Sequence, residues 1–304
     1  MLLVTGATGF IGRHFVEILR ERNIAFRATG RSGAYWLTDI GSINADTDWA
    51  EALKGVDTVI HLAAINENVI EDLNSGASQF TSVNVDGTAQ LAREAVRSGV
   101  RKFILLSTVK VNGEATCDGK PFTSHDHPAP QTPYAQSKYE AEEILKRISL
   151  QSQMQAWILR SPLVYGSGSK GSFNALAWLV EQGWPLPFGL IRNRRSMVHV
   201  ENLCDLILAT HYYEKAPLKI QTLMVSEGFA VSTPQLCEMI ACAKGRRAVM
   251  LPIAPWLLKI AGKLVGRSAL VSRLTQNLEV DDSEVQRLGW TPKLSPQEAL
   301  RRSV

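Results

Sequence analysis

The chain has 304 residues, of which 45% are hydrophobic and 20% charged, a composition typical of a globular protein with one large domain or two closely packed ones. Its formal net charge is +4, but no block of five or more like charges occurs, so we expect no nucleic-acid partner. The four cysteines show neither a C-x-x-C pairing nor a histidine at metal-ligand spacing, which predicts free thiols and no metal site.

The N-terminus combines a short apolar segment with a glycine-rich turn. Residues 1–5 (MLLVT) are predicted to form a strand with no signal peptide before it, so we expect a cytoplasmic protein. The strand leads through Gly6, Gly9 and Gly12 into an amphipathic helix. Because such a turn directs backbone N–H groups and the helix dipole at a phosphate, the sequence predicts a dinucleotide site here.

The type of dinucleotide is predicted from the end of the second strand, residues 24–29. An Asp or Glu about 20 residues beyond the glycines would bind the ribose 2′-hydroxyl of NAD. The chain instead has Arg31, with Arg13 as a second cation, and these suit a 2′-phosphate. The sequence therefore favours NADP(H), and NAD(H) held by other contacts stays the alternative.

Further apolar segments alternate with helical patterns through the first half of the chain. This alternation predicts an α/β fold, a Rossmann-type doubly wound parallel sheet, with ligand at the carboxyl ends of the strands. We interpret His61, at one of these ends, as a packed histidine beside the cofactor rather than a catalyst. The strands are expected at residues 37–40, 57–62, 102–107 and 156–159, and their ends carry Asp39, Ile40, His61, Leu62, Ala63, Ala64, Ser107 and Thr108.

Tyr134 and Lys138 lie four residues apart in a segment that favours helix, so both side chains are predicted on one helix face near its start. The lysine charge should favour the phenolate and lower the tyrosine pKa, which makes the pair an acid–base device. The alternative for this spacing alone is an exposed tyrosine beside a solvated lysine.

Two features stand out in the second half of the chain, an arginine cluster and an apolar segment. Arg192, Arg194 and Arg195 follow a loop and suit either a diphosphate ligand or a solvated basic face. Residues 251–265 are apolar but too short and too often interrupted to span a membrane. We expect them to form a helix packed in a small domain, without membrane association. The alternative is a helix on a membrane surface, with Lys259, Lys263 and Arg267 meeting anionic lipid.

Several motifs in a fixed order resemble the extended short-chain dehydrogenases/reductases, specifically the sugar-nucleotide epimerase/dehydratase group, over nearly the whole chain. They are GATGFIG at 6–12, HLAA at 61–64, LLSTVKVNG at 105–113, Y-x-x-x-K at 134–138, LRSPLVYG at 159–166 and RSMVHVENL at 195–203. The resemblance implies a hydride-transfer site with Tyr134 as the acid–base. Lys138 would lower the pKa of Tyr134 and bind nicotinamide ribose, and Thr108 would hydrogen-bond the reacting hydroxyl or carbonyl.

The resemblance also implies the remaining contacts, a UDP-sugar substrate and a homodimer formed through the helix of Tyr134. Substrate is expected at Thr108, Lys110, Arg195 and Arg273. Cofactor is expected at Gly6, Thr8, Gly9, Phe10, Ile11, Gly12, Arg13, Arg31, Asp39, Ile40, Leu62, Ala63, Ala64, Tyr134, Lys138, Pro162 and Val164.

One departure from the group's pattern narrows the predicted reaction. Dehydratases carry an Asp-Glu pair after the Thr, whereas Val109 and Lys110 follow Thr108 here, so we do not expect loss of water. The segment K-V-N-G-E resembles a UDP-glucose 4-epimerase-like subgroup that includes UDP-4-keto-6-deoxy-N-acetylhexosamine reductases of polysaccharide synthesis. We therefore predict a 4-ketoreductase of such a UDP-sugar. The alternatives are a UDP-hexose or UDP-N-acetylhexosamine 4-epimerase and, on the same fold, a non-catalytic dinucleotide-binding protein.

The predicted domain organisation follows from the same pattern. The dinucleotide-binding domain is expected to comprise residues 1–166 and 195–225. A smaller, mostly helical substrate domain is expected to comprise residues 167–194 and 226–304, with the substrate between the two.

Overall fold

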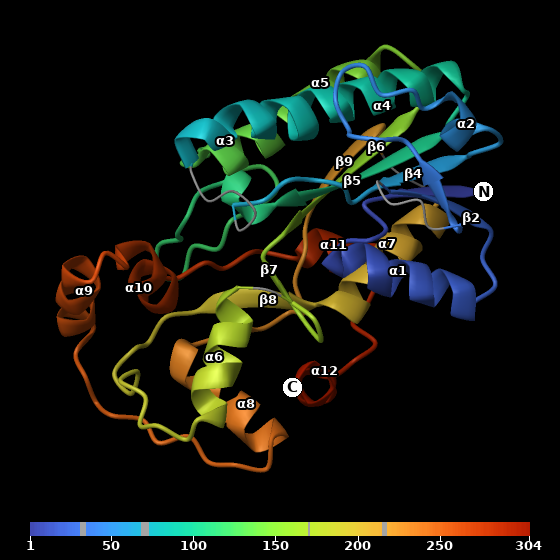
Figure 1. Ribbon diagram of the computed structural model, residues 1–304. Helices are drawn as coiled ribbons and strands as arrows, with labels where there is room; N and C mark the ends of the chain where they lie inside the picture. Colours follow the sequence, from blue (N-terminus) through green and yellow to red (C-terminus); the bar gives the residue numbers. More distant parts are fainter. Residues whose placement is uncertain (31–34, 68–72, 170, 215–217) are drawn as a thin grey trace.

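A computed structural model describes residues 1–30, 35–67, 73–169, 171–214 and 218–304. At its centre is a seven-stranded sheet with the order β3-β2-β1-β4-β5-β6-β9, in which all neighbouring strands are parallel (Figure 1). The predicted Rossmann-type doubly wound sheet is therefore confirmed. Its strands are β1 (Leu2–Thr5), β2 (Phe26–Gly30), β3 (Leu37–Asp39), β4 (Thr58–His61), β5 (Lys102–Thr108), β6 (Gln155–Ser161) and β9 (Ile220–Met224).

Helices cover both faces of this sheet (Figure 1). Along β1, Leu2 and Val4 join the core beneath α1 (Phe10–Glu21) and α7 (Val200–Tyr212). Leu3 points the other way, into the core shared with the second layer of helices. Successive strand residues face opposite sides, so a strand buried on both faces is apolar on both, as Leu2, Leu3 and Val4 of β1 are. The second layer contains α2 (Ala50–Leu53), α3 (Leu73–Phe80), the π-helical turn η1 (Thr81–Asp86), α4 (Gly87–Arg97) and α5 (Pro133–Leu150).

The order of the strands fixes where a ligand fits. From β1 the chain moves outward to β2 and β3, then returns to the other side of β1 and continues outward through β4, β5 and β6. The strand order thus reverses between β1 and β4. In doubly wound sheets the crevice at such a reversal, beyond the carboxyl ends of the strands, is the usual place for a ligand.

A smaller region with its own apolar core lies beyond those carboxyl ends (Figure 1). It is built on a three-stranded sheet of β10 (Ala230–Val231), β8 (Arg195–His199) and β7 (Leu163–Tyr165). This region is otherwise helical. The helices of this smaller region are α6 (Ser172–Glu181), α8 (Thr233–Ala243), α9 (Pro255–Leu264), α10 (Ser268–Thr275) and α12 (Pro296–Ser303), while the short α11 (Ser283–Arg287) contacts β9. The exact residue boundaries of the two predicted domains stay a prediction.

Candidate active site

The glycine turn between β1 and α1 is too compact for side chains. Gly6 has a φ of 70°, and a Cβ added there would lie 2.6 Å from the backbone nitrogen of Ala63. A Cβ on Gly12 would lie 2.1 Å from the carbonyl oxygen of Gly6. The first turn of α1 contains no acidic residue. Backbone N–H groups at the start of α1 are therefore open to a phosphate, and this cradle fits a dinucleotide.

A cavity of about 910 Å³ extends from this turn to the smaller sheet. Asp39, Ile40 and Ala63 do not line it, although the backbone of Ala63 lies against Gly6. Arg31 lies outside the described residues. The predicted site residues that the cavity brings together are Gly6, Thr8, Gly9, Phe10, Ile11, Gly12, Arg13, Leu62, Ala64, Thr108, Lys110, Tyr134, Lys138, Pro162, Val164, Arg195 and Arg273.

Helix α5 carries Tyr134 and Lys138 into the cavity. It begins after Thr132, whose hydroxyl caps it by accepting a hydrogen bond from the backbone N–H of Ala135 at 3.2 Å. Pro133 occupies the first turn, where a missing N–H costs nothing. Tyr134 and Lys138 thus share a helix face one turn apart, and both line the cavity.

The electrostatics of this pair differ from the sequence prediction. Burial lowers the pKa of Lys138 to about 8, despite the opposing charge of Glu142. Burial also raises the pKa of Tyr134, and the nearby carboxylate of Glu67 raises it further. The predicted lowering of the tyrosine pKa is therefore wrong, because desolvation and the charge of Glu67 both raise it. The phenol is neutral at neutral pH.

At two further strand ends, Thr108 of β5 lines the cavity, whereas His61 of β4 does not. Thr108 ends β5, is mostly buried, and accepts a hydrogen bond from the backbone N–H of Lys110 at 3.3 Å. His61 ends β4 and is buried, with its ring nitrogens 2.7 Å from the Thr5 hydroxyl and 2.9 Å from the Thr88 hydroxyl. Burial and the charge of Lys138 lower its pKa to about 3. His61 is thus a neutral, packed histidine, as predicted.

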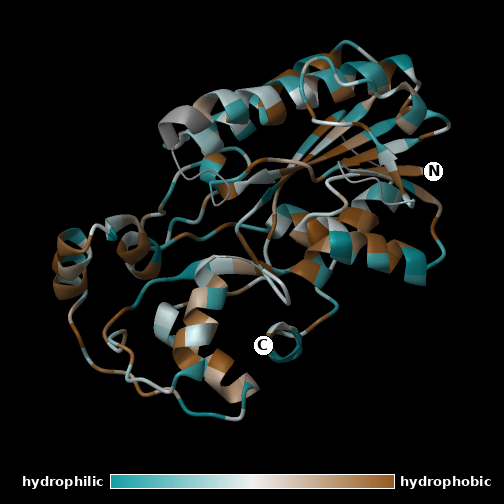
Figure 2. Ribbon diagram, in the orientation of Figure 1, coloured by the Kyte–Doolittle hydropathy of each residue, from teal (hydrophilic) through white to brown (hydrophobic). Residues whose placement is uncertain are grey.

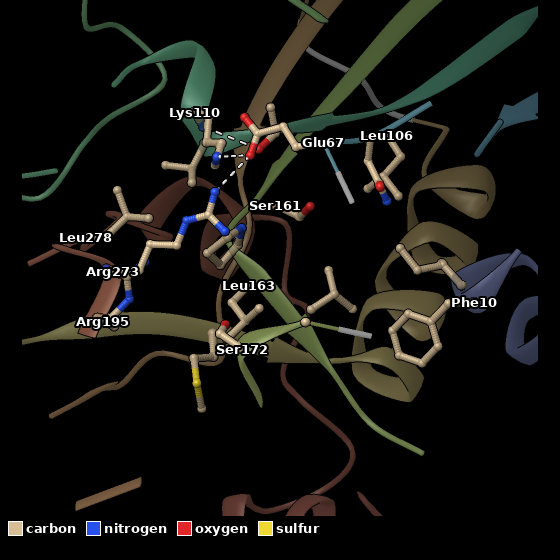
Figure 3. A pocket seen from close by; sticks show the side chains of 18 of the residues that line it. Phe10, Glu67, Leu106, Lys110, Ser161, Leu163, Ser172, Arg195, Arg273 and Leu278 are labelled. Atoms are coloured by element: carbon tan, nitrogen blue, oxygen red, sulfur yellow. Dashed lines mark hydrogen bonds and ion pairs between the residues drawn. The ribbon is translucent and has the colours of Figure 1, made fainter. Parts of the chain in front are cut away.

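Arg195 and Arg273 come from β8 and α10 and lie near one another at the cavity (Figure 3). Burial and, after it, the charge of Arg273 lower the pKa of Arg195 to about 10. A ligand with two negative charges would offset both the burial and the repulsion that act on the Arg195 guanidinium. The arrangement suits a diphosphate, which takes bidentate donors from each arginine.

Glu67 is a cavity residue that the sequence did not predict. Its carboxylate accepts hydrogen bonds from Lys110 at 2.7 Å and Arg273 at 3.1 Å (Figure 3). It also accepts one from the Thr132 hydroxyl at 2.8 Å. Burial acts to raise the pKa of Glu67, but these donors outweigh it and the pKa is lowered. Lys110 also pairs with Glu114 at 3.3 Å. The Lys110 ammonium is therefore held inside the cavity by two carboxylates.

Among the residues that the structure describes, no group of three or more His, Cys, Asp or Glu side chains is placed to hold a metal ion.

The cavity combines a phosphate cradle, a buried Tyr–Lys pair, a hydroxyl at a strand end and two arginines. These are the parts needed to hold a dinucleotide beside a second, diphosphate-bearing ligand and to move one proton between Tyr134 and that second ligand.

Comparison with known proteins gives concordant matches. The model of the NAD dependent epimerase/dehydratase family matches residues 2–219. A UDP-glucose 4-epimerase of Vibrio cholerae is 39% identical over 311 residues, covering 100% of this chain and 94% of that protein. The Thermotoga maritima UDP-glucose 4-epimerase solved with UDP-glucose superimposes with a TM-score of 0.76 at 23% identity, over 99% of this chain and 96% of that one. A UDP-N-acetylglucosamine 4-epimerase from Bacillus cereus gives 0.78 at 18% identity, with the same coverage.

Proposed function

The chain belongs to the NAD-dependent epimerase/dehydratase family, and we propose that it is a 4-epimerase of a UDP-hexose or UDP-N-acetylhexosamine. The observation that supports this most directly is the 39% identity to a UDP-glucose 4-epimerase over the whole chain. The 4-ketoreductase that the sequence favoured has less support. Its two arguments were Arg31 and the missing dehydratase acid pair. Neither separates the two activities, because Arg31 concerns the cofactor and an epimerase, like a reductase, needs no acid pair for water loss.

We propose NAD as the cofactor. The predicted preference for NADP(H) depends on Arg31, which lies outside the described residues, whereas the matching family is NAD-dependent. An epimerase keeps one cofactor through both half-reactions. The cradle around Gly6 and Gly12 would hold its diphosphate, and Tyr134 and Lys138 would lie at its nicotinamide end. The homodimer, the cytoplasmic location and a role in polysaccharide synthesis stay predictions.

The proposed mechanism assigns one task to each group around the sugar C4. NAD, when bound, supplies the reversible hydride transfer. Tyr134 takes the proton from the C4 hydroxyl and later returns it to the same C4 oxygen, once the opposite face of the keto sugar is turned toward the cofactor site. Lys138, whose pKa of about 8 leaves it charged at neutral pH, stabilises the phenolate that this requires. The Thr108 hydroxyl would hold the C4 oxygen, and Arg195 and Arg273 would hold the UDP diphosphate while the keto sugar rotates.

Replacing Arg195 with Met is expected to raise the KM for the UDP-sugar about 10- to 100-fold with a small change in kcat. The reason is that charge-assisted hydrogen bonds to a diphosphate act in the ground state and the transition state alike. Arg192→Met is the matched control, since Arg192 is exposed and does not line the cavity. Initial-rate kinetics at varied UDP-sugar concentration measure both. A fall in kcat at unchanged KM would contradict the diphosphate role.

Replacing Glu67 with Gln is expected to move the acidic limb of the pH–rate profile to lower pH. The carboxylate of Glu67 raises the pKa of Tyr134, so removing its charge lowers that pKa and the phenolate forms at lower pH. Glu114→Gln is the matched control, because Glu114 pairs with the same lysine but does not raise the tyrosine pKa. A profile of log kcat against pH for the three proteins decides between them. A shift toward higher pH would show that Glu67 does not act on Tyr134 by charge.

The proposed function is tested by the cofactor content and the reaction of the purified protein without additions. We expect acid denaturation to release about one NAD per chain, and incubation with UDP-glucose or UDP-N-acetylglucosamine to yield the C4 epimer without added cofactor. Protein that is purified without bound NAD and oxidises NADPH with a 4-keto sugar nucleotide would instead establish the reductase. Stoichiometric NAD without turnover of either sugar would contradict the proposed substrate class.

A further inference from the structure

Helix α9 presents an apolar face that the described part of the chain does not cover. Only Gly262 is buried in this helix, so the sequence expectation of a packed segment is wrong for most of its surface. Trp256 is 60% exposed, Ile260 49% and Leu264 82%. Residues four apart lie on one side of a helix, so these three form a single stripe. Leu257 and Val265 are also exposed, at its edge and its end.

The hairpin of α9 and α10 lies at the outer edge of the smaller region, and the ribbon of α9 is largely hydrophobic (Figure 2). It is anchored from within. Gly262 lies so close to Val271 of α10 that an added Cβ would be 2.6 Å from its Cγ2. Leu258, on the opposite side of α9 from the exposed stripe, packs against the core of the smaller region. The stripe is therefore held facing outward by a fixed scaffold.

The charged residues next to α9 in the sequence are all basic. Residues 239–278 contain no Asp or Glu, but they include Lys244, Arg246, Arg247, Lys259, Lys263, Arg267 and Arg273. On α9 itself, Lys259 and Lys263 lie four residues apart and flank the apolar stripe. An apolar stripe with tryptophan at its start and lysines along its side is the pattern of a helix that lies in the plane of a membrane interface.

We propose that the α9–α10 hairpin docks this protein onto the surface of a membrane rich in anionic lipid. The stripe of Trp256, Ile260 and Leu264 enters the boundary between headgroups and acyl chains, while Lys259 and Lys263 contact lipid phosphates. No helix of the described residues is long and apolar enough to cross a membrane, so contact of this hairpin is peripheral. A second copy of this chain is a poorer occupant, because the lysines would then need carboxylates that the hairpin does not contain.

Docking would bring the cavity close to the bilayer. The inner side of α10 contributes Arg273 and Leu274 to the cavity wall, whereas the stripe of α9 faces outward. The same hairpin therefore joins the ligand site to the docking surface, although neither depends on the other.

Vesicle sedimentation of the full chain tests the proposal. We expect binding to vesicles of phosphatidylcholine with about 30% phosphatidylglycerol, much weaker binding to phosphatidylcholine alone, and release as salt screens the lysines. The double variant Ile260→Gln with Leu264→Gln should bind about tenfold more weakly or worse, because it loses most of the buried apolar area. Trp178→Gln, a substitution of an exposed aromatic residue on α6, is the control and should bind like the unaltered chain.

Two accompanying measurements exclude a folding defect and a second copy as explanations. The double variant should keep its thermal midpoint and its turnover of a water-soluble UDP-sugar, since neither residue lines the cavity. Failure of the unaltered chain to sediment with anionic vesicles, or equal sedimentation of the double variant, would overturn the proposal. It would also be overturned if the double substitution converted a dimer to a monomer while vesicles bound neither protein.

Discussion

Replacing Tyr134 with Phe is expected to lower kcat about 10²- to 10⁴-fold, the usual contribution of a positioned general acid–base. The substitution removes one oxygen atom and keeps the ring, which packs at 6.0 Å from Phe80 between ring centroids. The glycine cradle and Lys138 are untouched, so cofactor content should stay the same. Turnover of the UDP-sugar and released NAD, measured on the same preparation, check both halves of this expectation.

Tyr139→Phe is the matched control, because Tyr139 lies on the same helix, undergoes the same chemical change and does not line the cavity. It should retain full turnover. If Tyr134→Phe retained turnover as well, the proposed proton transfer would be wrong. A protein that bound NAD but had no activity in either form would support the non-catalytic dinucleotide-binding alternative.

Much of the catalytic site could be predicted because its parts are local in sequence. A glycine turn needs only one strand and one helix around it, and both Gly6 and Gly12 are positions where no side chain fits. Tyr134 and Lys138 share a helix face by spacing alone. These features are specified within about ten residues each, and the parallel sheet then brings their strand ends together.

The electrostatic environment of the pair could not be predicted in the same way. Glu67 lies in an irregular segment after β4, and its three donors come from segments distant along the chain, so no periodicity reports it. Burial and, after it, the charge of Glu67 reverse the expected direction of the Tyr134 pKa shift. The sequence favoured a packed helix over the membrane-surface alternative at α9 for a related reason: an apolar helical pattern indicates an apolar face but not whether another element covers it.

Helix α5 is also fixed from behind by a buried ion pair that the sequence did not reveal. Glu142, one turn after Lys138, accepts three hydrogen bonds from Arg160 of β6, one from Nη2 at 2.6 Å and two from Nε at 3.1 and 3.2 Å. The side chain of Arg160 is 2% exposed and that of Glu142 is fully buried. The Ser107 hydroxyl, next to Thr108 on β5, donates to the same carboxylate. The ion pair therefore holds the helix of Tyr134 against the strand of Thr108.

Replacing Arg160 with Met is expected to destabilise the protein by about 3–5 kcal/mol, because it leaves the buried carboxylate of Glu142 without its cation. It also removes the donor to the Asn112 side-chain oxygen at 3.0 Å. Urea unfolding at a fixed NAD concentration measures the change, since bound cofactor stabilises the folded state by itself. Arg97→Met is the control. Arg97 pairs with Glu94 on an exposed part of α4, where a change below about 1 kcal/mol is expected.

The double variant Arg160→Met with Glu142→Leu separates the two contributions of the ion pair. Removing both charges eliminates the unpaired carboxylate, so most of the lost stability should return. Turnover should not return with it, because Ser107 then lacks the carboxylate that joins β5 to α5. Recovery of stability with kcat still lowered would assign the ion pair to the positioning of Thr108 relative to Tyr134. Recovery of both stability and kcat would show that the ion pair contributes to folding alone.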